Sequence, residues 1–212
     1  MRVVFGFCVV ALTSGAVLLD ASTESQTDRR PLAPSVRVTS LAYKYAEPRA
    51  LRSIRDVDFR NLRVVVFDAE GKPAGRFPLR NGLLERSTVV GGEDLDLGDV
   101  YYFKGAHNEN EKALVELSWL SCGGSCSQSG YLLVFELRRG ELFAIQQITY
   151  DLQAPGALDR FFPQSAVLTV LGRTADDSPH CCPKSLDEVT FDWTRNGFQV
   201  RSVQRLLLLK SD

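Results

Sequence analysis

Cysteines carry the most specific chemical signal in this sequence. Cys122 and Cys126 are separated by three residues in SCGGSCSQSG, and Cys181 and Cys182 are adjacent in SPHCCPKS. Four sulfurs can form disulfides, a redox couple or, together with His180, a tetrahedral site for zinc or Cu(I). The compartment in which the chain folds decides between these chemistries, because disulfides persist in oxidising surroundings and thiols in reducing ones.

The N-terminus has the layout of a secretory signal peptide. Arg2 precedes an uncharged apolar run from Val3 to Leu12, and small residues follow it. We therefore expect residues 1–21 to be removed on export and the mature chain to be secreted or periplasmic, with no membrane span. A membrane anchor is the alternative, but even extended to Leu19 the run is at the short limit for spanning. Export removes Cys8 and leaves an even number of cysteines, which favours disulfides.

Four cysteines allow three disulfide pairings. One pairing joins Cys122 to Cys126 and Cys181 to Cys182, whereas the other two cross-link the two cysteine loops. Closing a loop of about sixty residues removes roughly 4 kcal/mol of unfolded-chain entropy, against about 2 kcal/mol for the small Cys122–Cys126 ring. We predict that all four cysteines form disulfides and that at least one bond joins the loops. A copper- or thiol-handling protein that uses the C-x-x-x-C and H-C-C cysteines is the alternative.

Patterns for catalysis are incomplete. Ser125 lies in GGSCS, but position 127 is serine where a G-x-S-x-G elbow requires glycine. A cysteine nucleophile needs a histidine base, and the sequence has only His107 and His180. His180 directly precedes Cys181, and sequence neighbours rarely reach the geometry of an ion pair. We predict no catalytic residues, no resident metal and no cofactor.

An acidic segment, GEDLDLGD at residues 92–99, offers oxygen ligands at alternate positions, as calcium loops do. It lacks the fifth-position ligand and the closing glutamate of an EF-hand, because Leu97 and Gly98 occupy the middle of the loop. We therefore predict a solvated turn before the next strand. The carboxylates concerned are Glu93, Asp94, Asp96 and Asp99.

The balance of charge and the aromatic residues indicate which classes of binding partner to expect. Basic and acidic residues are nearly balanced, 25 against 26, which excludes the basic surface that nucleic-acid binding requires. A protein or glycan partner could stack on aromatic side chains. Strict alternation around Trp119 and Trp193 predicts that both are core residues, and Tyr102 is the aromatic residue we expect to be exposed. The other aromatic candidates are Tyr101, Phe103 and Tyr131.

The pattern along the chain predicts short strands joined by turns. Polar residues and prolines at 22–47 predict a flexible linker, and apolar residues at helical spacing predict one short helix near residues 48–57. Asn81-Gly82 and Asn196-Gly197 are expected to form type I′ turns, and Arg139-Gly140 a further turn. We expect strands at residues 62–68, 76–80, 83–86, 100–104, 113–119, 131–138, 142–150, 166–172, 188–194 and 198–209.

These elements define the expected fold class. The gaps between strands are mostly too short for parallel crossovers. The sequence therefore predicts a single all-β domain over residues 48–212, an antiparallel meander that forms a sandwich or a strongly curled sheet. In the C-terminal hairpin, the alternation places Val189, Phe191 and Trp193 in the core opposite Phe198 and Val200.

Several segments resemble a group of uncharacterised exported bacterial proteins. They include the D-F-x-N segment in VDFRNLRVVVFD, the L-x-N-G hairpin in PLRNGLLE, and C-C-P before a tryptophan-containing hairpin. The resemblance covers residues 57–203 and implies no activity. Many members of the group carry an acidic D-x-[DN]-G-D-G loop where this chain has KGAHNENEK, without the aspartates. Taken together, the sequence predicts an exported, non-enzymatic binding or structural module.

Overall fold

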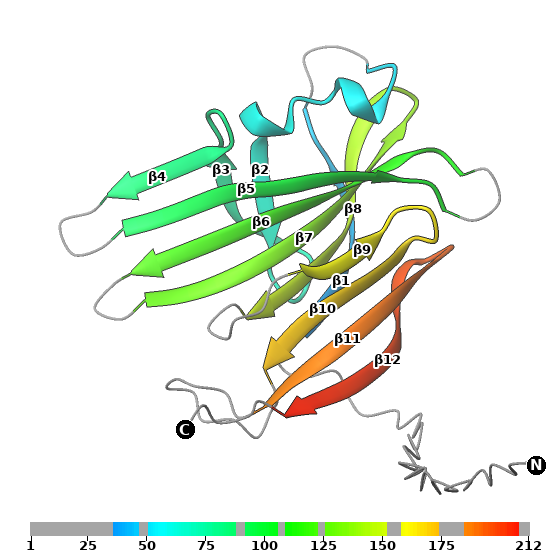
Figure 1. The fold of residues 1–212 in the computed structure, drawn as a ribbon. Helices are drawn as coiled ribbons and strands as arrows, with labels where there is room; N and C mark the ends of the chain where they lie inside the picture. Colours follow the sequence, from blue (N-terminus) through cyan, green and yellow to red (C-terminus); the bar gives the residue numbers. More distant parts are fainter. Residues whose placement is uncertain are drawn as a thin grey trace, which may run out of the picture.

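The computed structural model describes residues 36–46, 51–87, 92–105, 109–122, 126–151, 158–173 and 185–207. They form an antiparallel all-β fold, as the sequence predicts, and its strands are arranged in three sheets (Figure 1). The strands are β1 (Val36–Lys44), β2 (Arg63–Phe67), β3 (Pro73–Pro78), β4 (Leu83–Ser87), β5 (Gly92–Phe103), β6 (Lys112–Cys122), β7 (Cys126–Arg138), β8 (Glu141–Asp151), β9 (Leu158–Phe162), β10 (Val167–Arg173), β11 (Ser185–Thr194) and β12 (Gly197–Leu207).

A six-stranded sheet forms the central layer, in the order β1-β8-β7-β6-β5-β4. Figure 1 shows β2 and β3 behind this sheet and the four-stranded sheet β12-β11-β10-β9 below and in front of it. The central strands β6 and β7 are consequently buried on both faces. Leu132, Leu133 and Val134 are adjacent in β7 and all have no exposed surface. Burial on both faces explains why β7 contains a continuous apolar run at residues 131–135 rather than simple alternation.

Two adjacent glutamines of β8 attach the outer layers to the central sheet. Gln147 accepts a hydrogen bond from the Phe67 N–H (3.0 Å) and donates one to the Phe67 carbonyl (2.8 Å) in β2. On the other face, Gln146 accepts from the Phe198 N–H (2.8 Å) and donates to the Phe198 carbonyl (3.0 Å) in β12. Both glutamines are almost fully buried. Each amide therefore takes the place of a neighbouring strand at an otherwise open sheet edge.

A flexible linker is expected at residues 22–47, but the part of this segment that the structure describes contains a strand. Residues 36–44 form β1, which pairs antiparallel with β8 at the edge of the central sheet. The physical reason is that this edge strand is covered on both faces: Val36 and Thr39 are both buried although their side chains point to opposite sides of the sheet. Residues 22–35 lie outside the described part of the chain, as does the expected signal peptide.

The helix expected at residues 48–57 is not seen in its described part, which begins at Leu51. A single 3-10 turn, Ile54–Asp56, occupies this segment, and a second, Phe59–Asn61, follows. Ser53 closes a capping box with Asp56, which satisfies the free N–H groups of the first turn. The chain then becomes extended at Val57, so that Ile54, Val57 and Phe59 all enter the core.

The Asn81-Gly82 turn adopts the predicted conformation, with φ of 55° at Asn81 and 90° at Gly82. Arg80 and Leu83 exchange both backbone hydrogen bonds, at 2.9 and 3.1 Å. The strands on either side do not continue as a hairpin, however. β3 pairs with β2 while β4 pairs with β5, so this turn passes the chain from the two-stranded sheet to the central one. Arg139-Gly140 forms the predicted turn between β7 and β8.

The type I′ prediction for Asn196-Gly197 is wrong, because Gly197 (φ 96°) adopts a positive φ and Asn196 does not. The hydroxyl of Thr194 explains the difference: it accepts from the Asn196 N–H (3.1 Å) and donates to the Gly197 carbonyl (2.9 Å). Val189, Phe191 and Phe198 are buried as expected, whereas Val200 is 39% exposed. The two strands shift register between Thr190 and Phe191, directly beside the pairing of Phe191 with Val200.

The acidic segment 92–99 is also not a turn. It forms the first part of β5, in which Leu95 is buried and Asp94 and Asp96 are exposed on the alternate positions. Gly98 and Asp99 together oppose the single residue Glu116 of β6, because the register shifts between Leu97 and Val100. The extra residue is a β-bulge, which increases the local twist of the sheet.

Candidate ligand-binding site

A cavity of about 250 Å³ lies between the central sheet and the β2–β3 pair. The central sheet supplies residues from four strands, and the β2–β3 pair supplies the opposite wall. A concave site lined mainly by apolar groups with a few polar ones is the common form of a ligand-binding site. The lining residues are Arg37, Val66, Phe67, Asp68, Ala74, Gly75, Phe77, Trp119, Tyr131 and Thr149.

Aromatic side chains form the walls of this pocket. The rings of Phe77 and Trp119 lie 5.9 Å apart, and those of Trp119 and Tyr131 lie 6.3 Å apart. Phe77 is held against its own strand at Gly75, where a Cβ atom would come within 2.6 Å of the Phe77 ring. Glycine at this position therefore sets the position of one pocket wall.

The polar side of the pocket is built by two cross-strand partners. Arg37 of β1 lies directly opposite Thr149 of β8 in the antiparallel register, so both side chains occupy the same face of the sheet. The Thr149 hydroxyl accepts a hydrogen bond from Gln147 (3.0 Å). Arg37 is exposed, and among the described residues it forms neither a hydrogen bond nor an ion pair.

Two further polar groups of the pocket already have partners. One carboxylate oxygen of Asp68 accepts from the backbone N–H groups of Glu70 and Lys72, both at 2.9 Å, which closes the β2–β3 loop. Burial raises the pKa of Tyr131, while a hydrogen bond with Ser129 lowers it less, so Tyr131 remains a neutral phenol. Of the two charged side chains in the lining, Arg37 is thus the one without any hydrogen-bond partner among the described residues, whereas Asp68 is partly satisfied through one oxygen.

Trp119 lies at the edge of the core rather than inside it, in contrast to the core position that the alternation predicts. It is partly buried and packs against the cluster between the central sheet and β2–β3. Its Nε1 atom is buried and has no hydrogen-bond partner among the residues that the structure describes. A buried N–H group without an acceptor lowers the stability of the fold, and unsatisfied groups of this kind are found more often at functional sites.

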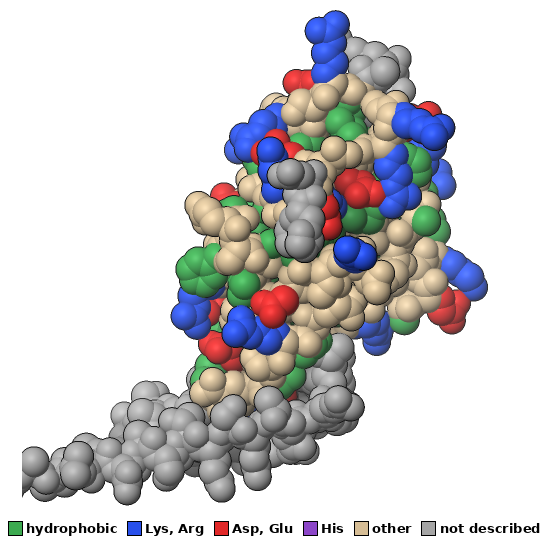
Figure 2. All heavy atoms as spheres, turned by 90° about the vertical axis from the view of Figure 1, so that its right-hand side faces the viewer, with side chains coloured by type: hydrophobic (Ala, Val, Ile, Leu, Met, Phe, Trp, Pro, Cys, Tyr) green, Lys and Arg blue, Asp and Glu red, His purple; other side chains and the backbone are tan. Residues whose placement is uncertain are grey.

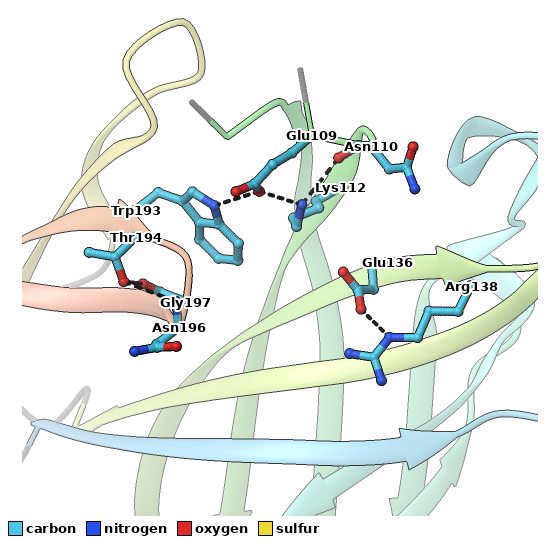
Figure 3. A network of polar contacts seen from close by, with 9 residues as sticks. All are labelled: Glu109, Asn110, Lys112, Glu136, Arg138, Trp193, Thr194, Asn196 and Gly197. Atoms are coloured by element: carbon cyan, nitrogen blue, oxygen red, sulfur yellow. Dashed lines mark hydrogen bonds and ion pairs between the residues drawn. The ribbon is translucent and has the colours of Figure 1, made fainter. Parts of the chain in front are cut away.

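The other aromatic candidates are structural. Trp193 is partly buried against Phe103 and Phe198, with ring centroids 5.1 Å away in each case. Figure 3 shows how its Nε1 donates to Glu109 (3.0 Å), which also pairs with the buried Lys112 (2.8 Å). Tyr102, expected to be exposed, is half-buried beneath the guanidinium of Arg55, 4.4 Å from the ring.

A second polar cluster surrounds the β5 bulge. The Tyr150 hydroxyl donates to Glu116 (3.2 Å), and the Tyr101 hydroxyl donates to Asp99 (3.1 Å). Burial, more than the nearby charge of Asp99, raises the pKa of Glu116, although its hydrogen bonds lower it. Burial and the Asp99 carboxylate raise the pKa of Tyr101 to about 12. The hydroxyl groups of this cluster are hydrogen-bonded to its own carboxylates, so we assign it a structural role.

The structure brings together few of the residues singled out from the sequence. Cys122 and Cys126 are register partners at the ends of β6 and β7, but their side chains lie outside the described part, as do Cys181 and Cys182. The same holds for Glu93, Ser125 and both histidines. Among described residues, His, Cys, Asp and Glu form no group of three or more able to hold a metal ion.

Sequence reasoning missed Arg37 and Thr149. The available signal was VRVT at residues 36–39, where β-branched residues recur within a polar context typical of an edge strand. The pairing of Arg37 with Thr149 is a long-range contact that the local pattern does not contain.

Surface charge agrees with the balanced composition. On the face drawn in Figure 2, basic and acidic side chains are interspersed over the strands rather than gathered by sign. In the described part of the chain, no helix has the length and apolar character needed to cross a membrane. Comparison of the chain with protein-family models, curated protein sequences and solved structures finds no match.

Proposed function

We propose that this chain is an exported, non-enzymatic binding module that holds a small ligand in the pocket between the central sheet and the β2–β3 pair. The observation that carries the proposal is the cavity of about 250 Å³ with aromatic walls and a cation at its rim. An apolar cavity of about 150 Å³ can bind benzene, so this volume suits a single ring with a short substituent. The sequence pattern of a signal peptide supports the exported setting.

The sheets provide a rigid frame for such a site. In this proposal the four-stranded and six-stranded sheets act as a sandwich, and disulfides of Cys122, Cys126, Cys181 and Cys182 restrain the loops. The amide of Gln147 supports the frame directly, because it joins Phe67 in one pocket wall to Thr149 in the other. Sites on well-supported strands hold their geometry better than sites on loops.

Ligand-detected NMR with small aromatic compounds tests the proposal. We expect single-ring compounds to bind the mature protein and the variant Ala74→Phe to lose this binding. Ala74 is an exposed lining residue, so a larger side chain there narrows the pocket without entering the core. Ala42→Phe, at an exposed position of β1 outside the pocket lining, is the matched control and should bind normally. Binding that survives Ala74→Phe would place the ligand elsewhere and refute the proposal.

A further inference from the structure

We propose that the ligand of this pocket is a small aromatic carboxylate, whose ring lies against the aromatic walls and whose carboxylate binds Arg37 and Thr149. This inference rests on the proposed function and specifies its ligand class. It follows from which polar groups of the pocket still have hydrogen-bonding capacity.

Arg37 and Thr149 both have donors available at the pocket. The guanidinium of Arg37 has five N–H groups and, within the described residues, no partner. The hydroxyl of Thr149 accepts from Gln147, so its own proton remains for another acceptor. Arg37 and Thr149 are register partners, so their side chains lie on the same face of the sheet, and both line the pocket. A carboxylate matches them, since its two oxygens take the fork of an arginine and one further donor.

The acidic residue of the lining is less available than Arg37. One carboxylate oxygen of Asp68 already accepts two backbone N–H groups in the β2–β3 loop, which leaves its second oxygen as the acceptor for a cation. Tyr131 offers a neutral phenol, which already hydrogen-bonds Ser129. Arg37 has no partner among the described residues, so the pocket offers more hydrogen-bonding capacity to a negative group than to a positive one.

The aromatic walls of the pocket indicate that the apolar part of the ligand is a ring. The Trp119 ring lies about 6 Å from both the Phe77 ring and the Tyr131 ring, with tilted geometry in each pair. Aromatic groups favour tilted and edge-to-face contacts at such separations, which a planar ring in the ligand can also make. The cavity volume limits the ligand to about one ring with its carboxylate.

Isothermal titration calorimetry with benzoate, benzyl alcohol and benzylamine tests the inference. These probes share a ring and differ in charge. We expect benzoate to bind at least tenfold more tightly than benzyl alcohol, and benzylamine to bind most weakly. In Arg37→Met, which keeps the apolar stem, benzoate should fall to the affinity of benzyl alcohol. Arg76→Met is the matched control, because it removes the same charge from an exposed residue of β3 that does not line the pocket. Its affinity for benzoate should equal that of the wild-type protein.

The outcomes separate the two proposals. If benzyl alcohol binds as tightly as benzoate, or if Arg37→Met leaves benzoate unaffected, the carboxylate inference is wrong while the pocket remains a binding site. If no probe binds the wild-type protein, the proposed function itself fails. Thermal denaturation of both arginine variants confirms that they are folded, and neither exposed side chain carries a contact on which the core depends.

Discussion

Gln146 and Gln147 are neighbours in β8, yet their amides bind backbone groups on opposite faces of the central sheet. Gln147 pairs with Phe67 of β2, and Gln146 pairs with Phe198 of β12. Gly197 makes room for the second contact, because a Cβ atom there would come within 2.8 Å of the Gln146 amide. One dipeptide thus joins three layers through four hydrogen bonds.

Replacing Gln147 by glutamate should destabilise the fold by about 2–4 kcal/mol. The substitution preserves shape but places an oxygen against the Phe67 carbonyl and buries an uncompensated charge. Chemical denaturation monitored by circular dichroism measures the change. Gln199→Glu on the exposed part of β12 is the control and should alter stability by less than about 0.5 kcal/mol. Equal losses of stability in both variants would show that the hydrogen bonds between Gln147 and Phe67 do not contribute to the free energy of unfolding.

Trp193→Ala should cost about 2–4 kcal/mol, somewhat below the value for a fully buried ring because Trp193 is only partly buried. The change removes ring contacts with Phe103 and Phe198 and leaves Glu109 without one of its donors. Trp193→Phe should recover more than half of the loss, since the ring contacts carry most of the energy. A melting temperature unchanged in Trp193→Ala would contradict this packing.

Gly130→Ala should destabilise the protein by about 1–3 kcal/mol through overpacking. The Tyr150 ring crosses β7 at Gly130 on its way to Glu116, and a Cβ atom at Gly130 would overlap it. A double-mutant cycle with Tyr150→Leu, which shortens the side chain, should show a coupling free energy above about 0.5 kcal/mol. Strict additivity of the two changes would mean that they do not meet.

The Glu116→Gln variant should have a flatter dependence of stability on pH. Burial raises the pKa of Glu116 in the folded state above its ordinary value of 4.5. Its contribution to stability is therefore fully present below pH 4.5 and declines as the pH rises through the raised value. Relative to wild type, the variant should gain stability as the pH rises above 4.5, measured by urea denaturation at a series of pH values. Glu70→Gln, at an exposed side chain, should not alter the slope.

Disulfide pairing remains a prediction of the sequence that peptide mapping without reductant can decide. We expect the four cysteines to be oxidised, with at least one bond between the 122–126 and 181–182 segments. The register adds a competing geometry, because directly opposed residues of an antiparallel ladder lie within the Cα separation that a disulfide spans. Isolation of separate 122–126 and 181–182 peptides would establish local pairing and refute the cross-link.

The sequence predicts the strands of this fold better than it predicts their partners. Alternation in β6, the apolar run in β7 and turns such as Arg139-Gly140 are local signals, and the structure contains these strands and this turn. Whether both faces of such a strand are buried depends on which layers cover it, and that depends on contacts between residues far apart in the sequence. The Asn81-Gly82 turn illustrates the limit, since its backbone conformation is local while the divergence of β3 and β4 is not.

Most of the candidate site could not be predicted from patterns in the sequence. Trp119 and Tyr131 were recognised as aromatic candidates, but their alternation is that of core residues and does not reveal a cavity between layers. Arg37 and Thr149 are 112 positions apart and meet only through the pairing of β1 with β8. A single sequence contains no local signal for such a contact.

The contacts of Gln147 have a dynamic consequence. Its amide nitrogen donates both to the Phe67 carbonyl and to the Thr149 hydroxyl, so one side chain joins the rim of the pocket to the hydrogen bonds that hold β2. A ligand that restrains Thr149 would also restrain Gln147 and the amide proton of Phe67. Occupancy of the pocket should therefore slow deuterium uptake at Phe67, in a strand whose backbone the ligand need not touch.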